Sequence, residues 1–490
     1  MEFTHLQQQA NIRIALLILW ASQMSVSAMN RYQRVTLVTA GLGFVVVLLD
    51  LSVVNVALEA LRTAFDTNVL GLQWVVNAYT LVFAALLLTS GALGDRFGAK
   101  RIFAAGFAVF TLASLACGLS PTLPSLVMSR VVQGLGAALL VPNSLAVLQQ
   151  AFPHREQRSR AVGWWGASGS IALAVGPVLG GLLVTHIGWR SIFLINIPIG
   201  ILGLVLTLVF VPTPTTKPER YLDLPGQATA VLALASLTVA LTEAGKLGWS
   251  APLVYRSLLF ALGATVYFVW LESRSPAPML PLSLFRIPAF SVASVTGIIV
   301  NFAYYGLVFV FSLFFQVVQH LSPQQTGLAF LPMTAVLFVA NIAAGRLITR
   351  LGAKSLMVAG LSLAAVGYLL LLPLRANGSY WLLVAPMLME ASGIALVIPT
   401  ITNVTLSSVE ASRAGIASGV LNSARQIGGV FGVTVFGFFV RDTAPDSFME
   451  GMHISIIVAV AVLVSGIGLC RLGIKEGRPA AKNVSVNKCS

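Results

Sequence analysis

The chain has 490 residues, of which 57% are hydrophobic and only 9% are charged, and its net charge is +14. A soluble globular domain carries charge on about a quarter of its residues, so this composition excludes that class. In a soluble chain the positive charge would suggest a nucleic-acid partner. Here the basic residues occupy short connections between long apolar runs, so we expect them to meet membrane lipid and no nucleic acid.

Apolar runs of about 20 residues recur from end to end, which is the length that a helix needs to cross a bilayer. Lipid admits only helices and closed barrels, and the alternating ten-residue pattern of a barrel is not present. We therefore predict an all-α polytopic membrane protein with fourteen spans. In chain order they fall at residues 35–58, 70–92, 102–119, 123–149, 160–184, 190–211, 226–244, 251–271, 288–318, 324–348, 355–373, 380–403, 412–440 and 452–470.

The distribution of basic residues predicts the orientation of these spans. With the N-terminus in the cytoplasm, the inner segments hold most Lys and Arg, as the positive-inside rule requires. Both termini are then cytoplasmic, and we expect the bacterial inner (plasma) membrane. The few basic residues in outer connections are Arg62, Arg190, Lys246, Arg375 and Arg441.

The first 30 residues do not fit this pattern. The run from Ile12 to Met29 is moderately apolar but contains Gln23 and several serines. It fits an interfacial helix, an uncleaved extension, or a stretch upstream of a true translation start at Met29. We favour the last, because the basic lead-in NRYQR follows closely. There is no convincing signal-peptide cleavage site.

The chain carries an internal duplication. The sequence GALGDRFGAK from Gly91 to Lys100 returns as GRLITRLGAK from Gly345 to Lys354, 254 residues later (345 minus 91). QGLGAALLVPNSLAVL from Gln133 likewise resembles EASGIALVIPTITNVTL from Glu390. Spans 1–6 therefore correspond to spans 9–14. The predicted domains are an N-terminal cytoplasmic extension (1–34), a six-helix half (35–211), linkers with two extra spans (212–287), a second six-helix half (288–470) and a basic cytoplasmic tail (471–490).

Two charged residues of the first half are expected at the same depth in the membrane. At 1.5 Å per residue, Asp50 lies roughly 8 Å from the outer end of its span, and Arg130 lies about 10 Å from the outer end of its own. Each charge is costly in lipid unless it faces a cavity or a partner. We predict that they pair and that Asp50 carries a proton. The alternative is a purely structural ion pair.

The second half offers a similar pair. Glu390 lies roughly 15 Å from the outer side, and Arg425 lies about 10–12 Å from it. We predict that Glu390 is a second proton site or a cation-recognition site, and that Arg425 holds it when it is empty.

Four motifs carry a resemblance to a known family. They are the loop GALGDRFGAK, the sequence LDLSVVNVAL around Asp50, the sequence SRVVQGLGAA around Arg130, and AVGPVLGG in span 5. Together they resemble the major facilitator superfamily, specifically its fourteen-span drug:proton antiporters, which include multidrug and antibiotic-resistance exporters of the methylenomycin-resistance type. The resemblance covers about residues 35–470 and implies a major facilitator fold with two extra central helices.

The resemblance also implies roles for these motifs. In the family, the loop after span 2 is a conformational latch, the acid of the first motif couples transport to protons, and the span 5 motif is typical of exporters. The chain departs from the family pattern at Thr349, which replaces the latch Asp in the second copy, and at Ala172, where a glycine is usual. The latch residues are Gly91, Gly94, Asp95, Arg96, Gly98, Lys100 and Arg101, and the antiporter motif comprises Gly176, Pro177, Gly180 and Gly181.

A substrate cavity is expected near the midplane, between the two halves. Aromatic faces suit planar or cationic organic molecules, although most aromatic side chains in spans face lipid or the interface. The candidate cavity residues are Trp74, Asn77, Tyr79, Gln133, Trp164, Trp165, Asn301, Tyr304 and Tyr305.

These features predict a monomeric, proton-coupled antiporter that exports small amphipathic organic compounds by alternating access. A proton-independent facilitator, an exporter of a single metabolite and a sensor without flux are the open alternatives. An enzyme is disfavoured, because the histidines are scattered and no nucleophile–base set or metal cluster appears. GDRFGAKR lacks the residue order of a phosphate-binding loop. We therefore expect no cofactor and no metal, with the proton gradient as the energy source.

Overall fold

The structure is a computed structural model, and it describes residues 29–212, 223–276, 278–376, 378–410 and 413–474. The described residues form helices and no strand. The run from Ile12 to Ala28 and the tail from Lys475 lie outside them, so the three readings of the N-terminus stay predictions. The first described helix begins after Asn30, whose side chain accepts a hydrogen bond from the backbone of Gln33 in a capping box.

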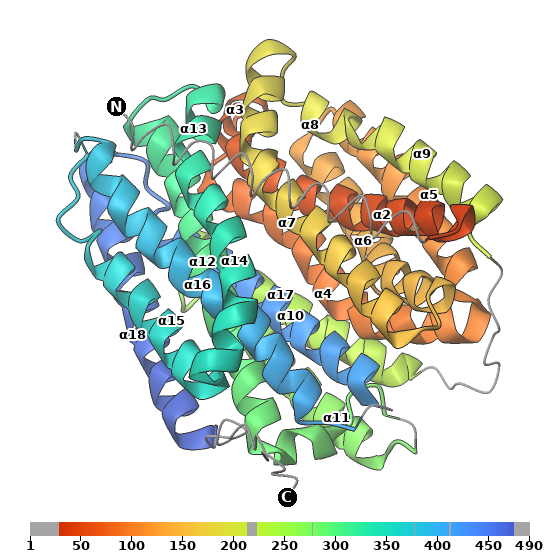
Figure 1. Ribbon diagram of the computed structural model, residues 1–490. Helices are drawn as coiled ribbons and strands as arrows, with labels where there is room; N and C mark the ends of the chain where they lie inside the picture. The colour runs from red at the N-terminus through yellow and green to blue at the C-terminus, as the bar shows by residue number, and fades with distance from the viewer. Residues whose placement is uncertain (1–28, 213–222, 277, 377, 411–412, 475–490) are drawn as a thin grey trace, which may run out of the picture.

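Two bundles of helices lie side by side (Figure 1). The first half consists of α2 (Arg31–Val56), α3 (Leu58–Ala64), α4 (Val69–Phe97), α5 (Ala99–Leu119), α6 (Leu123–Ala151), α7 (Arg155–His186), α8 (Ser191–Leu194) and α9 (Asn196–Phe210). A hairpin of α10 (Leu224–Leu247) and α11 (Pro252–Arg274), with a 3-10 turn η1 (Leu282–Arg286), connects the halves. The second half consists of α12 (Pro288–Leu313), the π-helical turn η2 (Phe314–Val318), α13 (Pro323–Ala329), α14 (Leu331–Leu351), α15 (Ala353–Leu369), α16 (Trp381–Ser407), α17 (Ala414–Phe439) and α18 (Pro445–Gly473).

The two halves repeat one packing pattern. In the first half α2 packs on α7, α4 and α5 pack on α6, and α9 packs on α5. In the second half α12 packs on α17, α14 and α15 pack on α16, and α18 packs on α15. Each pair is the counterpart of the other under the sequence duplication, so the repeated sequences fold into repeated structures.

Each predicted span coincides with a helix or with two consecutive helices. Twelve of the described helical segments are long and apolar enough to cross a membrane. The two remaining predicted spans correspond to the shorter apolar helix α15 and to α17. The protein is therefore a multi-pass membrane protein.

Two predicted spans are interrupted, and a proline explains each break. Pro198 cannot donate a backbone hydrogen bond to Leu194, so span 6 divides into α8 and α9 at Ile195. Pro332 has the same effect in span 10, which divides into α13 and α14 at Phe330.

The duplicated signature forms the same tight turn in both halves. Gly98 connects α4 to α5 with φ of 96°, and Gly352 connects α14 to α15 with φ of 78°. These left-handed conformations favour glycine. Because successive spans alternate in direction, both turns lie on the face where α2 begins and α18 ends, here named the terminal face. The opposite face, which carries α3 and α13, is named the far face.

Candidate functional site

Asp50 of α2 and Arg130 of α6 form an ion pair inside the first half. Their exposed fractions are 0% and 1%, so both charges are out of contact with solvent. Arg130 Nη1 donates a hydrogen bond to Asp50 Oδ2. The structure thus brings together the two residues whose depths along their helices predict a contact.

Two amides hold the other oxygen of Asp50. Gln133 Nε2 donates to Asp50 Oδ1 over 2.8 Å, and Asn196 Nδ2 donates to the same atom over 3.0 Å. Gln133 Nε2 also donates to Ser114 Oγ over 2.9 Å. Both oxygens of the carboxylate therefore have donors, which is what a buried ionised form needs.

Arg130 has partners that do not depend on Asp50. Its Nε donates to the carbonyl oxygen of Val75 over 3.1 Å, and its Nη1 donates to Gln133 Oε1 over 2.7 Å. The guanidinium carbon lies 4.2 Å from the centre of the Tyr79 ring, where a cation–π interaction stabilises it. If Asp50 took up a proton, Arg130 would keep these contacts, so the network can accommodate a change of charge at Asp50.

The predicted antiporter motif brings α7 against the second half near the far face. A Cβ on Gly181 would lie 2.4 Å from the carbonyl oxygen of Pro323 in α13. Conversely, a Cβ on Gly327 of α13 would lie 2.3 Å from the carbonyl oxygen of Pro177. Only glycine permits this close approach of two backbones.

The other two glycines of the motif fit α7 onto α2. A Cβ on Gly176 would lie 1.7 Å from Ser52 Oγ, and one on Gly180 would lie 3.1 Å from Val53 Cα. The motif therefore lets α7 pack closely on its own half and on the second half together.

Toward the terminal face α7 and α14 present open surfaces. A Cβ added to Gly163 or Gly166 of α7, or to Gly345 of α14, would have no neighbouring heavy atom within 4 Å. The side chain of Trp164 is 44% exposed. The close contact of α7 with the second half is thus made with α13 near the far face, and these glycines of α7 and α14 face open space toward the terminal face.

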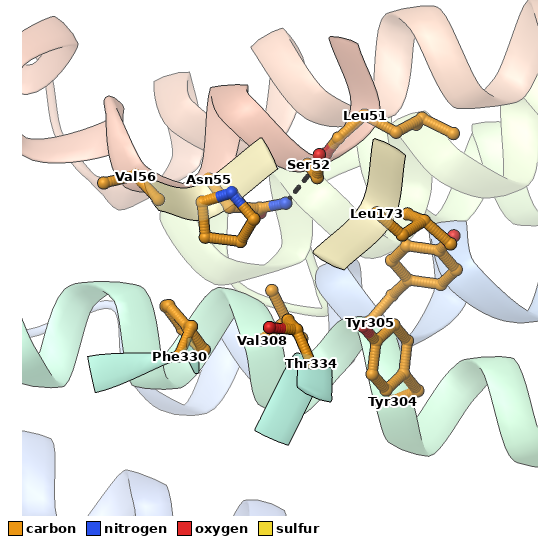
Figure 2. A pocket seen from close by; sticks show the side chains of 11 residues that line it. Leu51, Ser52, Asn55, Val56, Leu173, Tyr304, Tyr305, Val308, Phe330 and Thr334 are labelled. Carbon is orange, nitrogen blue, oxygen red and sulfur yellow. Dashed lines mark hydrogen bonds between the residues drawn. The ribbon is translucent and has the colours of Figure 1, made fainter. Parts of the chain in front are cut away.

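A small cavity lies where α2 and α7 face α12 and α14 (Figure 2). Its volume is about 20 Å³, which is room for one water molecule and not for an organic substrate. Of the predicted cavity residues, Tyr304 and Tyr305 line it, whereas Tyr79 and Gln133 belong to the network around Asp50. The lining residues are Leu51, Ser52, Asn55, Val56, Leu173, Pro177, Tyr304, Tyr305, Val308, Phe330 and Thr334.

Two polar residues of α4 that were predicted for the cavity face other helices. Trp74 Nε1 donates to Glu243 Oε1 of α10 over 3.2 Å. Asn77 Nδ2 donates to Thr434 Oγ1 of α17 over 2.8 Å. Both side chains hold α4 against its neighbours.

The remaining predicted cavity residues also lie elsewhere. Trp165 stacks on Phe44 with ring centroids 3.9 Å apart and donates to Ser144 Oγ, so it packs inside the first half. Asn301 donates to a carbonyl of its own helix. Trp164 is on the open part of α7.

The structure does not pair Glu390 with Arg425. Glu390 of α16 is fully buried, and neither of its carboxyl oxygens has a hydrogen-bond partner in the part of the chain that the structure describes. The Arg425 side chain lies against Gly297 of α12, and its Nη1 donates to Asn422 over 3.5 Å. The expectation that Arg425 holds Glu390 is therefore wrong for this conformation, because the two side chains face different neighbours.

The predicted latch lies at the terminal face. Gly94 packs so closely on α6 that a Cβ would lie 1.8 Å from Asn143 Oδ1. Arg96 and Arg101 are exposed, and Lys100 is half-buried. The latch function of this loop stays a prediction.

Comparison with known proteins decides the family. The family model described as Major Facilitator Superfamily matches residues 40–433. The chain belongs to the major facilitator superfamily.

Relatives within the major facilitator superfamily are named for antibiotic or drug resistance, and one of them is also named for export. The chain is 37% identical over 440 residues to the methylenomycin A resistance protein of Streptomyces coelicolor, covering 90% of this chain and 92% of that protein. It is 40% identical over 409 residues to the multidrug resistance protein Stp of Mycobacterium tuberculosis, covering 84% and 76%. It is 33% identical over 420 residues to the tetracenomycin C resistance and export protein of Streptomyces glaucescens, covering 85% and 78%.

Solved structures of major facilitators share the fold. The crystal structure of a D-xylose–proton symporter matches with a TM-score of 0.67 at 14% identity, covering 91% of this chain and 99% of that chain. A bacterial homologue of the lysosomal transporter Spinster matches with a TM-score of 0.64 at 16% identity, covering 91% and 98%. The protein is thus a transporter of the superfamily and not an enzyme.

Sequence reasoning missed two members of the network around Asp50. Asn196 stands just before Pro198 at a helix break inside a span, and a polar residue beside such a break is a signal that could have identified it. Ser114 is a lone serine in an apolar span, and nothing in its surroundings distinguishes it from a packing residue.

Proposed function

We propose that this major facilitator is a proton-coupled antiporter that exports small amphipathic organic compounds from a bacterial cell. It works by alternating access in the inner membrane, with the terminal face in the cytoplasm. It acts as a monomer and needs no cofactor beyond the proton gradient.

The buried pair of Asp50 and Arg130 carries this proposal. An ionisable carboxyl group inside a membrane protein is costly and is usually functional. Asp50 has donors for its ionised form, and Arg130 keeps its other contacts when Asp50 is neutral. Protonation of Asp50 from outside favours substrate release, and loss of the proton to the cytoplasm resets the carrier.

The arrangement of α7 and α14 supports alternating access. Near the far face α7 meets α13 at Gly181. Toward the terminal face a Cβ on Gly163 of α7 or on Gly345 of α14 would have no neighbouring heavy atom within 4 Å. With the terminal face in the cytoplasm, this conformation faces inward. Substrate would enter from the cytoplasm and leave after the two halves rock about the central cavity.

The names of the relatives support the substrate class. One relative is named for methylenomycin A, one for tetracenomycin C and one for multiple drugs. The substrates of this chain would therefore be antibiotics or similar organic compounds.

Everted membrane vesicles with an inside-acid gradient test the proposal. We expect a panel of lipophilic cations, neutral antibiotics and organic acids to include compounds that dissipate the gradient. Asp50→Asn should abolish this dissipation. Asp66→Asn is the matched control, because Asp66 is an exposed acid between α3 and α4. A proton-independent facilitator would instead transport compounds in Asp50→Asn as it does in wild type.

A further inference from the structure

Glu390 is the one carboxyl group in the described spans whose two oxygens are both buried without a hydrogen-bond partner. A carboxylate without a partner is strongly disfavoured in an apolar interior, so such a group is held in its neutral form. Asp50, by contrast, has Arg130, Gln133 and Asn196 as donors. Asp50 and Glu390 thus stand in opposite environments in the same conformation.

The duplication relates the two environments. The repeat that takes Gly91 to Gly345 takes Asp50 to Tyr304, since both steps are 254 residues. The aligned stretches that begin at Gln133 and Glu390 place Glu390 where the first half has Gln133. In the second half the acid, Glu390, is therefore on the fourth helix of the repeat. On the first helix of that half, Tyr304 stands at the position that Asp50 has in the first half.

The same step takes Ser114 of α5 to Tyr368 of α15 (114 plus 254). A Cβ on Gly367, which precedes Tyr368, would lie 2.6 Å from the backbone nitrogen of Glu390, so α15 packs directly on α16 beside the acid. The Tyr368 hydroxyl donates its hydrogen bond to the carbonyl oxygen of Ala303 over 2.6 Å, so it does not donate to Glu390.

No permanent positive charge among the described residues neutralises Glu390. Arg425 on α17 packs against α12 instead. On α14 the ionisable residues are Arg346 and Arg350, which are exposed near the terminal end of that helix. Tyr304 of α12 and Tyr368 of α15, which bonds to Ala303 beside Tyr304, carry no positive charge.

Tyr304 stands next to Ala303, the hydrogen-bond partner of Tyr368, and lines the space between the halves. Tyr304 and Tyr305 line the central cavity, with ring centroids 5.1 Å apart in an edge-to-face arrangement (Figure 2). Aromatic rings attract organic cations, and the attraction grows when water is excluded. A cation bound to these rings would be close to the neutral Glu390. Once Glu390 loses its proton, its carboxylate attracts the cation.

We propose that Glu390 exchanges its proton for an organic cation and so makes the transporter accept cationic substrates as well as neutral ones. The proposal rests on the proposed function, because it adds a second proton to the antiport cycle. When the cation arrives from the cytoplasm, Glu390 releases its proton to water on that side and the carboxylate pairs with the cation. After the halves rock, a proton from outside re-forms the acid and the cation leaves.

This exchange has a consequence for stoichiometry. A neutral substrate leaves the proton on Glu390 throughout, so only Asp50 cycles a proton. A cationic substrate displaces the second proton as well. The cation therefore moves one proton more per molecule than the neutral compound.

Proteoliposomes that contain the full chain test this exchange. The probes are tetraphenylphosphonium, a permanent lipophilic cation, and the neutral antibiotic that gives the largest response in the vesicle panel. We expect Glu390→Gln to lower the ratio of cation export to neutral-compound export at least tenfold. The variant should also remove the difference in protons moved per molecule. Glu390→Asp should restore part of the cation export.

Equal transport of both probes in Glu390→Gln and wild type would overturn the proposal, as would an equal loss of both. Gln occupies the equivalent position in the first half, at Gln133, so the variant should fold, and its melting temperature in detergent serves as a check. Asp50→Asn separates the two proposals. If that variant still exports both probes with proton coupling, the role of Asp50 fails and the antiport function stands. If the wild type exports neither probe in response to the proton gradient, the proposed function itself fails, whatever Glu390→Gln does.

Discussion

The side-chain amide of Asn196, at the start of α9, donates a hydrogen bond to Oδ1 of Asp50 over 3.0 Å. α9 begins there because Pro198 interrupts span 6, so the helix break places a donor beside the buried acid. The ion pair is therefore held by four helices: α2 and α6 carry its two residues, α9 supplies Asn196, and α4 supplies the carbonyl oxygen of Val75.

We predict that Asn196→Ala lowers proton-coupled export. The variant removes a donor to the ionised form of Asp50, and a hydrogen bond to a charged group is worth about 1.5–3 kcal/mol. Export should fall about tenfold or more, because about 1.4 kcal/mol corresponds to a factor of ten in rate. Initial export rates in everted vesicles under one fixed proton gradient measure the loss. Asn301→Ala, which removes an amide bonded to its own helix, is the control and should export at the wild-type rate. A wild-type rate in Asn196→Ala would contradict the role of this contact.

We predict that Gly181→Ala prevents closure near the far face. The added Cβ would lie 2.4 Å from the carbonyl oxygen of Pro323, so α7 and α13 must move apart. Export should fall at least tenfold, and a cysteine at Gln324 should react faster with a membrane-impermeant thiol reagent. Gly166→Ala is the matched control, because Gly166 lies on the same helix and a Cβ there would have no neighbouring heavy atom within 4 Å. If both variants behaved alike, the close contact of α7 with α13 would not be needed for transport.

We predict different effects for two aromatic residues that sequence reasoning placed in the cavity. Tyr305 lines the central cavity, whereas Trp74 is bonded to Glu243 of α10. Tyr305→Ala should change the order in which compounds are exported. Trp74→Phe should preserve that order and lower stability by about 1 kcal/mol, because it removes one hydrogen bond. Export rates for the compound panel, together with melting temperatures, distinguish the two. If Trp74→Phe changed the order in which the compounds are exported, Trp74 would have to contact substrate after all.

Helix depth explains what the sequence could predict and what it could not. The rise of a helix fixes how deep a residue lies, so Asp50 and Arg130 were matched correctly from their positions along α2 and α6. Depth does not fix rotation about the helix axis or the identity of the neighbouring helix. Glu390 and Arg425 have similar depths and nevertheless face different neighbours.

The spans and the duplication were predictable because apolar length and repeated turns are local properties of the sequence. The residues that line the cavity were not predictable, because an aromatic residue in a span can face lipid, a neighbouring helix or a cavity equally well. Trp165 illustrates this, since it stacks on Phe44 inside the first half.

Helix α10 of the connecting hairpin contacts both α4 and α17, which also contact each other. The described side-chain hydrogen bonds between α10 and the two halves go to α4: Gln227 donates to the carbonyl oxygen of Ala85, and Glu243 accepts from Trp74. Its contacts with α17 are apolar, such as Gly245 against Phe438. Apolar surfaces can slip past each other without leaving donors unmatched. We therefore expect the hairpin of α10 and α11 to move together with the first half as one rigid body. The two extra helices would then leave transport as a motion of only two bodies.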